Sequence, residues 1–74
     1  MERKKYLELC QQNAVYPFSK TVEYEGSEHY PMSYELGFEK NGQSTHTAIL
    51  LDKNKKSVIR CDLEGVDYSE EKNS

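Results

Sequence analysis

The fold is decided by residues 28–39, EHYPMSYELGFE. Every even position from Tyr30 to Phe38 carries an aromatic or aliphatic side chain, and every odd position is polar, small or proline. Successive side chains of a strand point to opposite faces, so this alternation predicts a long strand with one buried face; an amphipathic helix would space its apolar residues three and four apart. Pro31 removes one ladder hydrogen bond, so we expect it at a bulge or where the neighbouring strand offers no acceptor.

Residues 2–14 are expected to form the only helix, which ends by about residue 15 because Pro17 disfavours helical geometry at Tyr16. Charged and amide side chains cover one side of this helix. The opposite, core-facing stripe is predicted to contain Tyr6, Leu7, Cys10 and Ala14, with Leu9 beside it.

Two turns set the expected registers of the long strand. Before it, a strand over 20–25 is joined through Gly26-Ser27. A two-residue loop would place Tyr24 opposite His29, whereas a three-residue loop places Tyr24 opposite Tyr30 and keeps the apolar groups on one face, which we favour. After it, Asn41-Gly42 predicts a two-residue type I′ hairpin with Lys40 opposite Gln43. This register assigns residues 49 and 51 to the core face. It assigns His46, Ala48 and Leu50 to the other face, across from Gly37, Glu35 and Ser33.

A last strand is expected over 57–63, after the polar loop 52–56. An odd-length loop is favoured because it turns Ile59, Cys61 and Leu63 inward and leaves Arg60 outside. Burial of an unpaired arginine would be costly. Residues 69–74 are expected to be a disordered tail. The sequence thus predicts a single α+β domain over 1–68, with one N-terminal helix packed on a four-stranded antiparallel meander.

The expected elements differ in length, which bears on function. Ten strand residues extend about 33 Å at ~3.3 Å per residue, whereas a helix of 12 or 13 residues spans about 19 Å. The sheet must therefore bend, or part of its apolar face stays uncovered. An uncovered apolar strip marks a partner site in many proteins.

Composition excludes several classes of protein. The chain has 74 residues, 31% of them charged, and a net charge of −3, which argues against a dedicated nucleic-acid binder. No apolar run approaches the ~18 residues of a membrane span, and no apolar segment follows the basic start as in a signal peptide. We therefore expect a cytoplasmic protein without membrane contact, whose Cys10 and Cys61 are reduced thiols.

Short motifs are spread over residues 20–66: Tyr30-Pro31, Ser33-Tyr34-Glu35-Leu36, His46-Thr47-Ala48-Ile49-Leu50, Ser57-Val58-Ile59 and Asp62-Leu63-Glu64. Together they resemble a group of short, uncharacterised proteins encoded on conjugative transposons and prophage-like elements of Gram-positive bacteria. The resemblance implies a mobile-element setting and a cytoplasmic location. It implies no activity, cofactor or catalytic residue.

Catalytic chemistry has few candidate groups in this chain. A Cys–His pair can perform acyl transfer only where thiolate and imidazole meet, and Cys61 and His46 are expected on opposite faces of the sheet. Metal-binding spacings such as C-x-x-C are absent from the sequence. We therefore predict no enzyme, no cofactor and no metal site. The expected function is a protein-interaction module of a mobile genetic element, which binds another protein or itself. Its expected partner surface is made of Tyr30, Tyr34, His46 and Leu50.

Nucleic-acid binding is the alternative function. Residues 53–60 carry four basic side chains, and the helix start adds three more. Cations grouped in this way can contact phosphates, although charges in hairpin loops also serve as solvated surface that blocks edge pairing. The candidate phosphate contacts are Arg3, Lys4, Lys5, Lys53, Lys55, Lys56 and Arg60.

Overall fold

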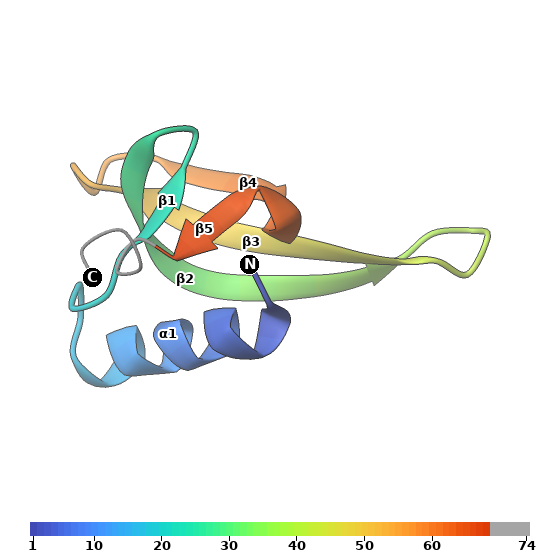
Figure 1. Ribbon diagram of the computed structural model, residues 1–74, viewed down its shortest axis with the longest axis horizontal. Coiled ribbons are helices and arrows are strands. Elements are labelled where there is room, and N and C mark those ends of the chain that lie inside the picture. Colours follow the sequence, from blue (N-terminus) through green and yellow to red (C-terminus); the bar gives the residue numbers. More distant parts are fainter. Residues whose placement is uncertain (69–74) are drawn as a thin grey trace.

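The structure, a computed structural model, describes residues 1–68 as an α+β fold with an N-terminal helix and an antiparallel sheet (Figure 1). The tail expected at 69–74 lies outside the described residues. The elements are α1 (Arg3–Val15), β1 (Val22–Tyr24), β2 (Ser27–Phe38), β3 (Ser44–Asp52), β4 (Val58–Asp62), the 3₁₀ turn η1 (Leu63–Gly65) and β5 (Val66–Tyr68). The predicted fold class is confirmed, but the sheet has five strands where four were expected.

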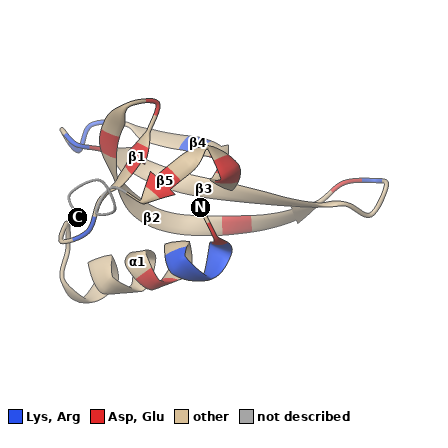
Figure 2. Ribbon diagram, viewed as in Figure 1, with Lys and Arg blue, Asp and Glu red and all other residues tan. Residues whose placement is uncertain are grey.

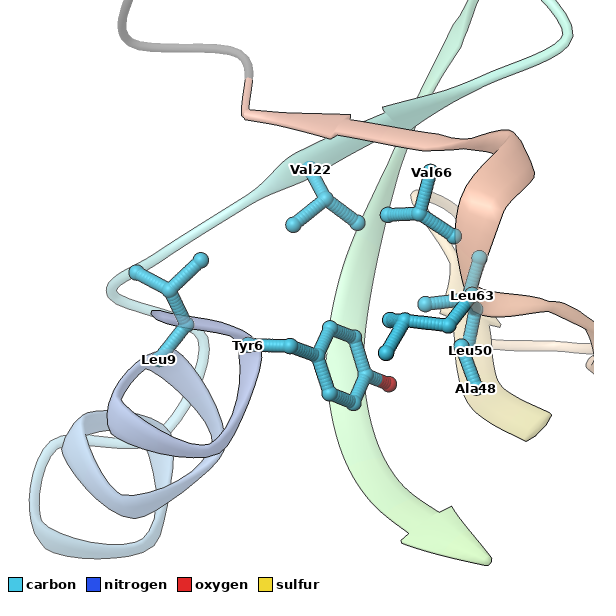
Figure 3. Close-up of a cluster of buried hydrophobic side chains, with 7 residues drawn as sticks. All are labelled: Tyr6, Leu9, Val22, Ala48, Leu50, Leu63 and Val66. Carbon is cyan, nitrogen blue, oxygen red and sulfur yellow. The ribbon is translucent and has the colours of Figure 1, made fainter. Parts of the chain in front are cut away.

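The additional strand explains how the sheet encloses its core. The order is β4-β3-β2-β1-β5, so the last strand returns to pair with β1 at the far edge. Between β4 and β5 the chain turns through η1, where the Asp62 carboxylate accepts a hydrogen bond from the Glu64 amide at 3.0 Å. The sheet bends along β2, so β1 and β5 lie across the core from β3 (Figures 1 and 3).

A β-bulge at Met32 controls which side chains of β2 face the core. Pro31 pairs with Leu50 and Ser33 pairs with Ile49, which leaves Met32 without a partner on β3. The expectation that Pro31 lies at a bulge is therefore confirmed. The extra residue interrupts the alternation, so Tyr30 lies on one face of the sheet while Tyr34 lies on the other. We call the face that carries Ala48 and Leu50 the inner face, because both side chains are fully buried there.

The predicted register of the β2–β3 hairpin is wrong by one residue on β3. Phe38 pairs with Ser44 rather than residue 45, because the loop is a three-residue loop closed by Glu39 N–H to Gln43 O at 2.8 Å. Within this loop only Gly42 has a positive φ, +86°, as in a type I turn followed by a left-handed glycine. The faces of β3 are consequently exchanged.

The first hairpin also differs from prediction. Tyr24 pairs with Ser27, so the two-residue loop is Glu25-Gly26, with φ of 51° and 80°. Two successive positive φ values make a type I′ turn, which fits the twist of the strands. Val22 consequently faces His29 on the inner face and is fully buried.

In β4 the predicted side-chain directions are confirmed. Ile59 and Cys61 pair with Leu50 and Ala48 on the inner face, and Arg60 is exposed on the other face. The odd-length loop is wrong, since Asp52 N–H donates to Ser57 O across a four-residue loop, 53–56. The wrong loop length and the wrong register of β3 each exchange the two faces of a strand. Together they cancel, so the predicted directions of the β4 side chains are correct.

The core lies between α1, the bent sheet and η1 (Figure 3). It consists of Tyr6, Leu9, Val22, Ala48, Leu50, Leu63 and Val66. On α1 the buried positions are Tyr6, Leu9 and Asn13, so the predicted stripe through Leu7 is rotated from the true one, and Leu7 is exposed. A polar residue in the stripe was not expected, which is why the apolar pattern alone gave the wrong orientation.

Asn13 and Tyr6 attach α1 to the irregular part of β2. The Asn13 amide nitrogen donates to Pro31 O at 3.2 Å and to Lys20 O at 3.1 Å. The Tyr6 hydroxyl lies 2.8 Å from Ser33 O and 3.0 Å from Ile49 O. Both helix side chains therefore hydrogen-bond to backbone carbonyls beside the bulge, where regular pairing is interrupted.

Candidate functional site

The far half of the β2–β3 hairpin, residues 34–46, extends beyond the neighbouring strands of the sheet. We call this segment the hairpin arm. Figure 1 shows it projecting beyond the end of α1 and beyond β4. Pairing with β4 ends at Thr47, which faces Asp62, and pairing with β1 ends at His29. An isolated two-stranded hairpin is marginally stable in water, so exposed apolar groups on this arm are costly unless something covers them.

Two such groups lie on the inner face of the arm, beyond the core. Leu36 is 47% exposed and Phe38 is 73% exposed. They pair across the hairpin with His46 and Ser44, neither of which covers them. This agrees with the expectation from element lengths that part of the apolar face of the long strand stays uncovered.

Tyr34 and His46 form the base of the arm, where it joins the core. Their rings stack with centroids 5.8 Å apart, and the Tyr34 hydroxyl shares a short hydrogen bond with His46 Nδ1. His46 Nε2 lies 3.3 Å from Ser44 Oγ. The imidazole is thus held at both nitrogens and in a fixed plane. The partner of its Nδ1 is a phenol hydroxyl, whereas in a catalytic triad the partner is a carboxylate.

A groove of about 860 Å³ lies beside the arm, along the edge of β3 that β4 leaves open. Its walls include His46 and Cys61, which the sequence had placed on opposite faces. That expectation is wrong: the exchanged register of β3 puts both on the inner face. Burial, and then the charges of Asp62 and Glu25, raise the pKa of the Cys61 thiol. A raised thiol pKa is the opposite of what activates a cysteine nucleophile.

Two members of the predicted partner surface are not at the surface. Leu50 is fully buried, because the true register turns it into the core. Tyr30 is 7% exposed and lies on the opposite face from Tyr34, because the bulge at Met32 separates them. Tyr34 and His46 remain together on the arm. Sequence reasoning missed Leu36 and Phe38, although the excess length of the strand over the helix was the signal that could have identified them.

One group of basic residues lies at the start of α1 and another in the β3–β4 loop, and further basic residues lie on β4 and at the tip of the β2–β3 hairpin (Figure 2). In the loop group, Lys53 binds the Glu28 carboxylate at 2.9 Å and lies over the Tyr30 ring. This hydrogen bond raises the pKa of Lys53. Lys55 lies 4.0 Å from the centroid of the Phe18 ring.

The remaining predicted phosphate contacts are similarly dispersed. Arg60 forms an ion pair with Glu35 on the outward face of the sheet. At the start of α1, Lys5 lies over the Tyr68 ring at 4.5 Å, while Arg3 and Lys4 are exposed. Several of these cations therefore already have partners within the chain, and the seven do not form one continuous surface.

Residues 1–68 also bear on metal, thiol and membrane sites. That part of the chain holds no group of three histidine, cysteine or carboxylate side chains arranged to bind a metal ion. Cys10 and Cys61 are both free and half-buried, and burial raises the pKa of Cys10 as well. Among the described helices, none has the length and apolar character needed to cross a bilayer.

Comparison with protein-family models, curated proteins and solved structures found no significant match to this chain.

Proposed function

We propose that this protein is a small, non-enzymatic, cytoplasmic interaction module, and that the hairpin arm is its binding surface. The observation that carries the proposal is the exposure of Leu36 and Phe38 on a two-stranded segment that no other described element flanks. Burial of apolar surface is the main favourable term in association, and exposed apolar groups grouped on one element mark binding sites.

The fixed orientation of Tyr34 and His46 supports the same proposal. A binding surface gains affinity when its side chains are already ordered, because less conformational entropy is lost on association. Stacking and two hydrogen-bonding contacts order the His46 ring at the base of the arm. A partner would therefore bind a surface on which Tyr34 and His46 are already ordered and Leu36 and Phe38 lie beside them on the same face.

Affinity capture from the native host tests this function. We expect wild-type protein to capture a partner, and Phe38→Asp to lose it, since a carboxylate at a buried contact is costly. Val15→Asp is the matched control: Val15 is similarly exposed, at 64%, but lies at the far end of α1. Equal capture by all three proteins would contradict the proposal.

The mobile-element setting, which the sequence resemblance implies, is a separate proposal. The genes adjacent to the coding sequence test it directly. Conjugation or phage genes on both sides would support it, and a chromosomal housekeeping operon would contradict it.

A further inference from the structure

We propose that the partner of the hairpin arm is a second copy of this chain, and that the two copies pair along β2 to form one continuous sheet. The pairing is antiparallel and two-fold symmetric about Leu36. It places Leu36 beside the partner's Leu36, and Tyr34 beside the partner's Phe38. This inference rests on the proposed function, because it names the occupant of the surface described there.

The backbone of β2 presents matching donors and acceptors along this line. Glu39 N–H donates a hydrogen bond to Gln43 O at the end of the hairpin, which makes these two residues a hydrogen-bonded pair. In an antiparallel ladder hydrogen-bonded pairs alternate with non-bonded pairs, whose N–H and C=O groups point away from the neighbouring strand. Counting back from Glu39, the N–H and C=O groups of Tyr34, Leu36 and Phe38 all point away from β3. We call this row the open edge of β2.

The same alternation is consistent on the other side of β3. Asp52 N–H donates to Ser57 O, so Ala48 and Cys61 are a bonded pair two steps further along. Ala48 therefore directs its backbone groups toward β4, as it must if its pairing with Tyr34 is a non-bonded one. Two independent hydrogen bonds thus assign the same direction to the open edge.

The open edge is unoccupied within the described chain. β1 pairs with β2 only at Ser27, Glu28 and His29. The next outward carbonyl, of Pro31, accepts a hydrogen bond from Asn13 of α1. From Tyr34 to Phe38 no hydrogen bond reaches the edge from α1 or β1 among the described residues. Unpaired strand edges of this kind are templates for strand addition.

Side chains on the open edge are complementary to themselves. In the two-fold register, Tyr34, Leu36 and Phe38 pair only with the same three residues of the second copy. Their side chains all lie on the inner face of the sheet. Directly opposed aromatic and aliphatic residues stabilise paired strands, and they are close enough to remove each other from water. The exposed side chains of Leu36 and Phe38 would then be covered by Leu36 and Tyr34 of the second copy.

Charge also favours this register. The only charged residue between Tyr34 and Phe38 is Glu35, and it already forms an ion pair with Arg60. Two-fold pairing about Leu36 places Glu35 opposite the partner's Gly37, so the two carboxylates do not oppose each other. Like charges directly opposite on paired strands would be destabilising.

The open part of β3 is a poorer site for a second copy. Only Ser44 and His46 direct backbone groups outward there before Asp62 of β4 pairs with Thr47. The side chains at this edge are mostly polar, so pairing would bury little apolar surface. We therefore assign the contact to β2.

The oligomeric state of the full chain tests the inference. A five-residue edge gives an interface below the usual ~1,200–2,000 Å², so we expect a concentration-dependent dimer between about 5 and about 500 µM by sedimentation equilibrium. Leu36→Pro removes an outward N–H without removing a β2–β3 hydrogen bond, and we expect it to be monomeric. Ser44→Pro makes the same change on β3, and we expect it to dimerise like wild type.

A charge exchange tests the register and remains informative if the proline variants do not fold. Leu36→Glu and Leu36→Lys change a half-exposed side chain and should both fold. Each variant alone would oppose like charges across the two-fold axis, so we expect monomers. An equimolar mixture would oppose unlike charges, and we expect it to recover the dimer.

The outcomes separate this inference from the proposed function. A monomeric wild type at about 500 µM, a dimeric Leu36→Pro, loss of the dimer in Ser44→Pro, or no recovery in the mixture would each overturn pairing along β2. If the wild type is monomeric but Phe38→Asp still loses a captured host protein, the arm is a binding surface for a different partner. If neither assay depends on the arm, both proposals fail.

Discussion

At the scale of single residues, Asn13 does more for the fold than its polar character suggests. Its amide nitrogen donates to two carbonyls, and its amide oxygen accepts from Lys20 N–H at 2.8 Å and from the Ser19 hydroxyl at 3.2 Å. It is 8% exposed. A buried residue that uses its hydrogen-bonding capacity in this way fixes the chain after α1 to the bulge of β2.

Replacement of Asn13 tests this role. Asn13→Ala leaves the buried Pro31 carbonyl and the Lys20 amide without this partner, so we expect the free energy of unfolding to fall by about 2–3 kcal/mol. Urea denaturation followed by circular dichroism measures the change. Gln11→Ala, an exposed amide on the same helix, is the control and should stay within about 0.5 kcal/mol. A similar loss in both variants would contradict the role assigned to Asn13.

Tyr6 gives a prediction about alkaline pH. Burial, reinforced by the nearby Cys10, raises the pKa of Tyr6 far above its ordinary value, so the native state keeps the phenol protonated. The unfolded chain loses this proton near pH 10. The contribution of Tyr6 is thus complete below pH 10 and is lost as pH rises further, by about 1.4 kcal/mol per pH unit.

The comparison that isolates this effect is wild type against Tyr6→Phe. Near pH 8 we expect the variant to be less stable by about 1 kcal/mol, because Ser33 O and Ile49 O lose a donor. By pH 11 the difference should shrink or reverse, since the variant has no phenol to ionise on unfolding. Tyr16→Phe, at an exposed position, should follow wild type throughout. Identical pH slopes for wild type and Tyr6→Phe would contradict the prediction.

At the scale of elements, the hairpin arm depends on a close approach between its two strands. A Cβ added at Gly37 would lie 2.6 Å from Thr45 Oγ1, too close for either atom to remain in place. We expect Gly37→Ala to destabilise the protein by about 1–2 kcal/mol. In a Thr45→Ala background the same change should cost less, with a coupling of at least about 0.5 kcal/mol in a double-mutant cycle of unfolding free energies. Strict additivity would show that the two positions do not touch.

Elements also show how far the sequence determines the fold. Strict alternation predicted β2 almost to its ends, because that pattern depends only on the two-residue period of a strand. The pairing of β2 was not predictable in the same way. The bulge at Met32 and the three-residue loop each shift the register by one residue, and one shift exchanges the two faces of a strand. β5 was missed because its three residues are too few to show a period.

The candidate site was predictable to the same extent. An uncovered apolar strip followed from the lengths of strand and helix, which require no register. Its members did not follow, because Tyr30 and Leu50 were assigned by alternation across an unrecognised bulge and an incorrect loop length. The burial of Leu50 and the exposure of Phe38 are therefore consequences of pairing, which local sequence does not specify.

At the scale of the whole molecule, the distribution of charge bears on nucleic-acid binding, the alternative function predicted from the sequence. The basic residues are dispersed over the molecule, and several are held by acidic or aromatic partners. Phosphate binding would have to displace these partners, in a protein whose net charge is −3. We therefore expect the Kd for a single strand of about 20 nucleotides, or a duplex of about 20 base pairs, to exceed about 100 µM at about 150 mM salt. This is the weak end of non-specific binding.

Fluorescence anisotropy over a salt series measures this affinity, and a paired variant tests its cause. Glu28→Gln with Glu35→Gln releases Lys53 and Arg60 from their carboxylates and adds two units of positive charge. Glu2→Gln with Glu8→Gln makes the same change in charge at the N-cap and in the first half of α1. If internal partners are what suppress phosphate binding, only the first pair should strengthen it, with a steeper dependence on salt. Micromolar binding by wild type would instead favour the nucleic-acid function, and equal gains in both pairs would show that net charge alone sets the affinity.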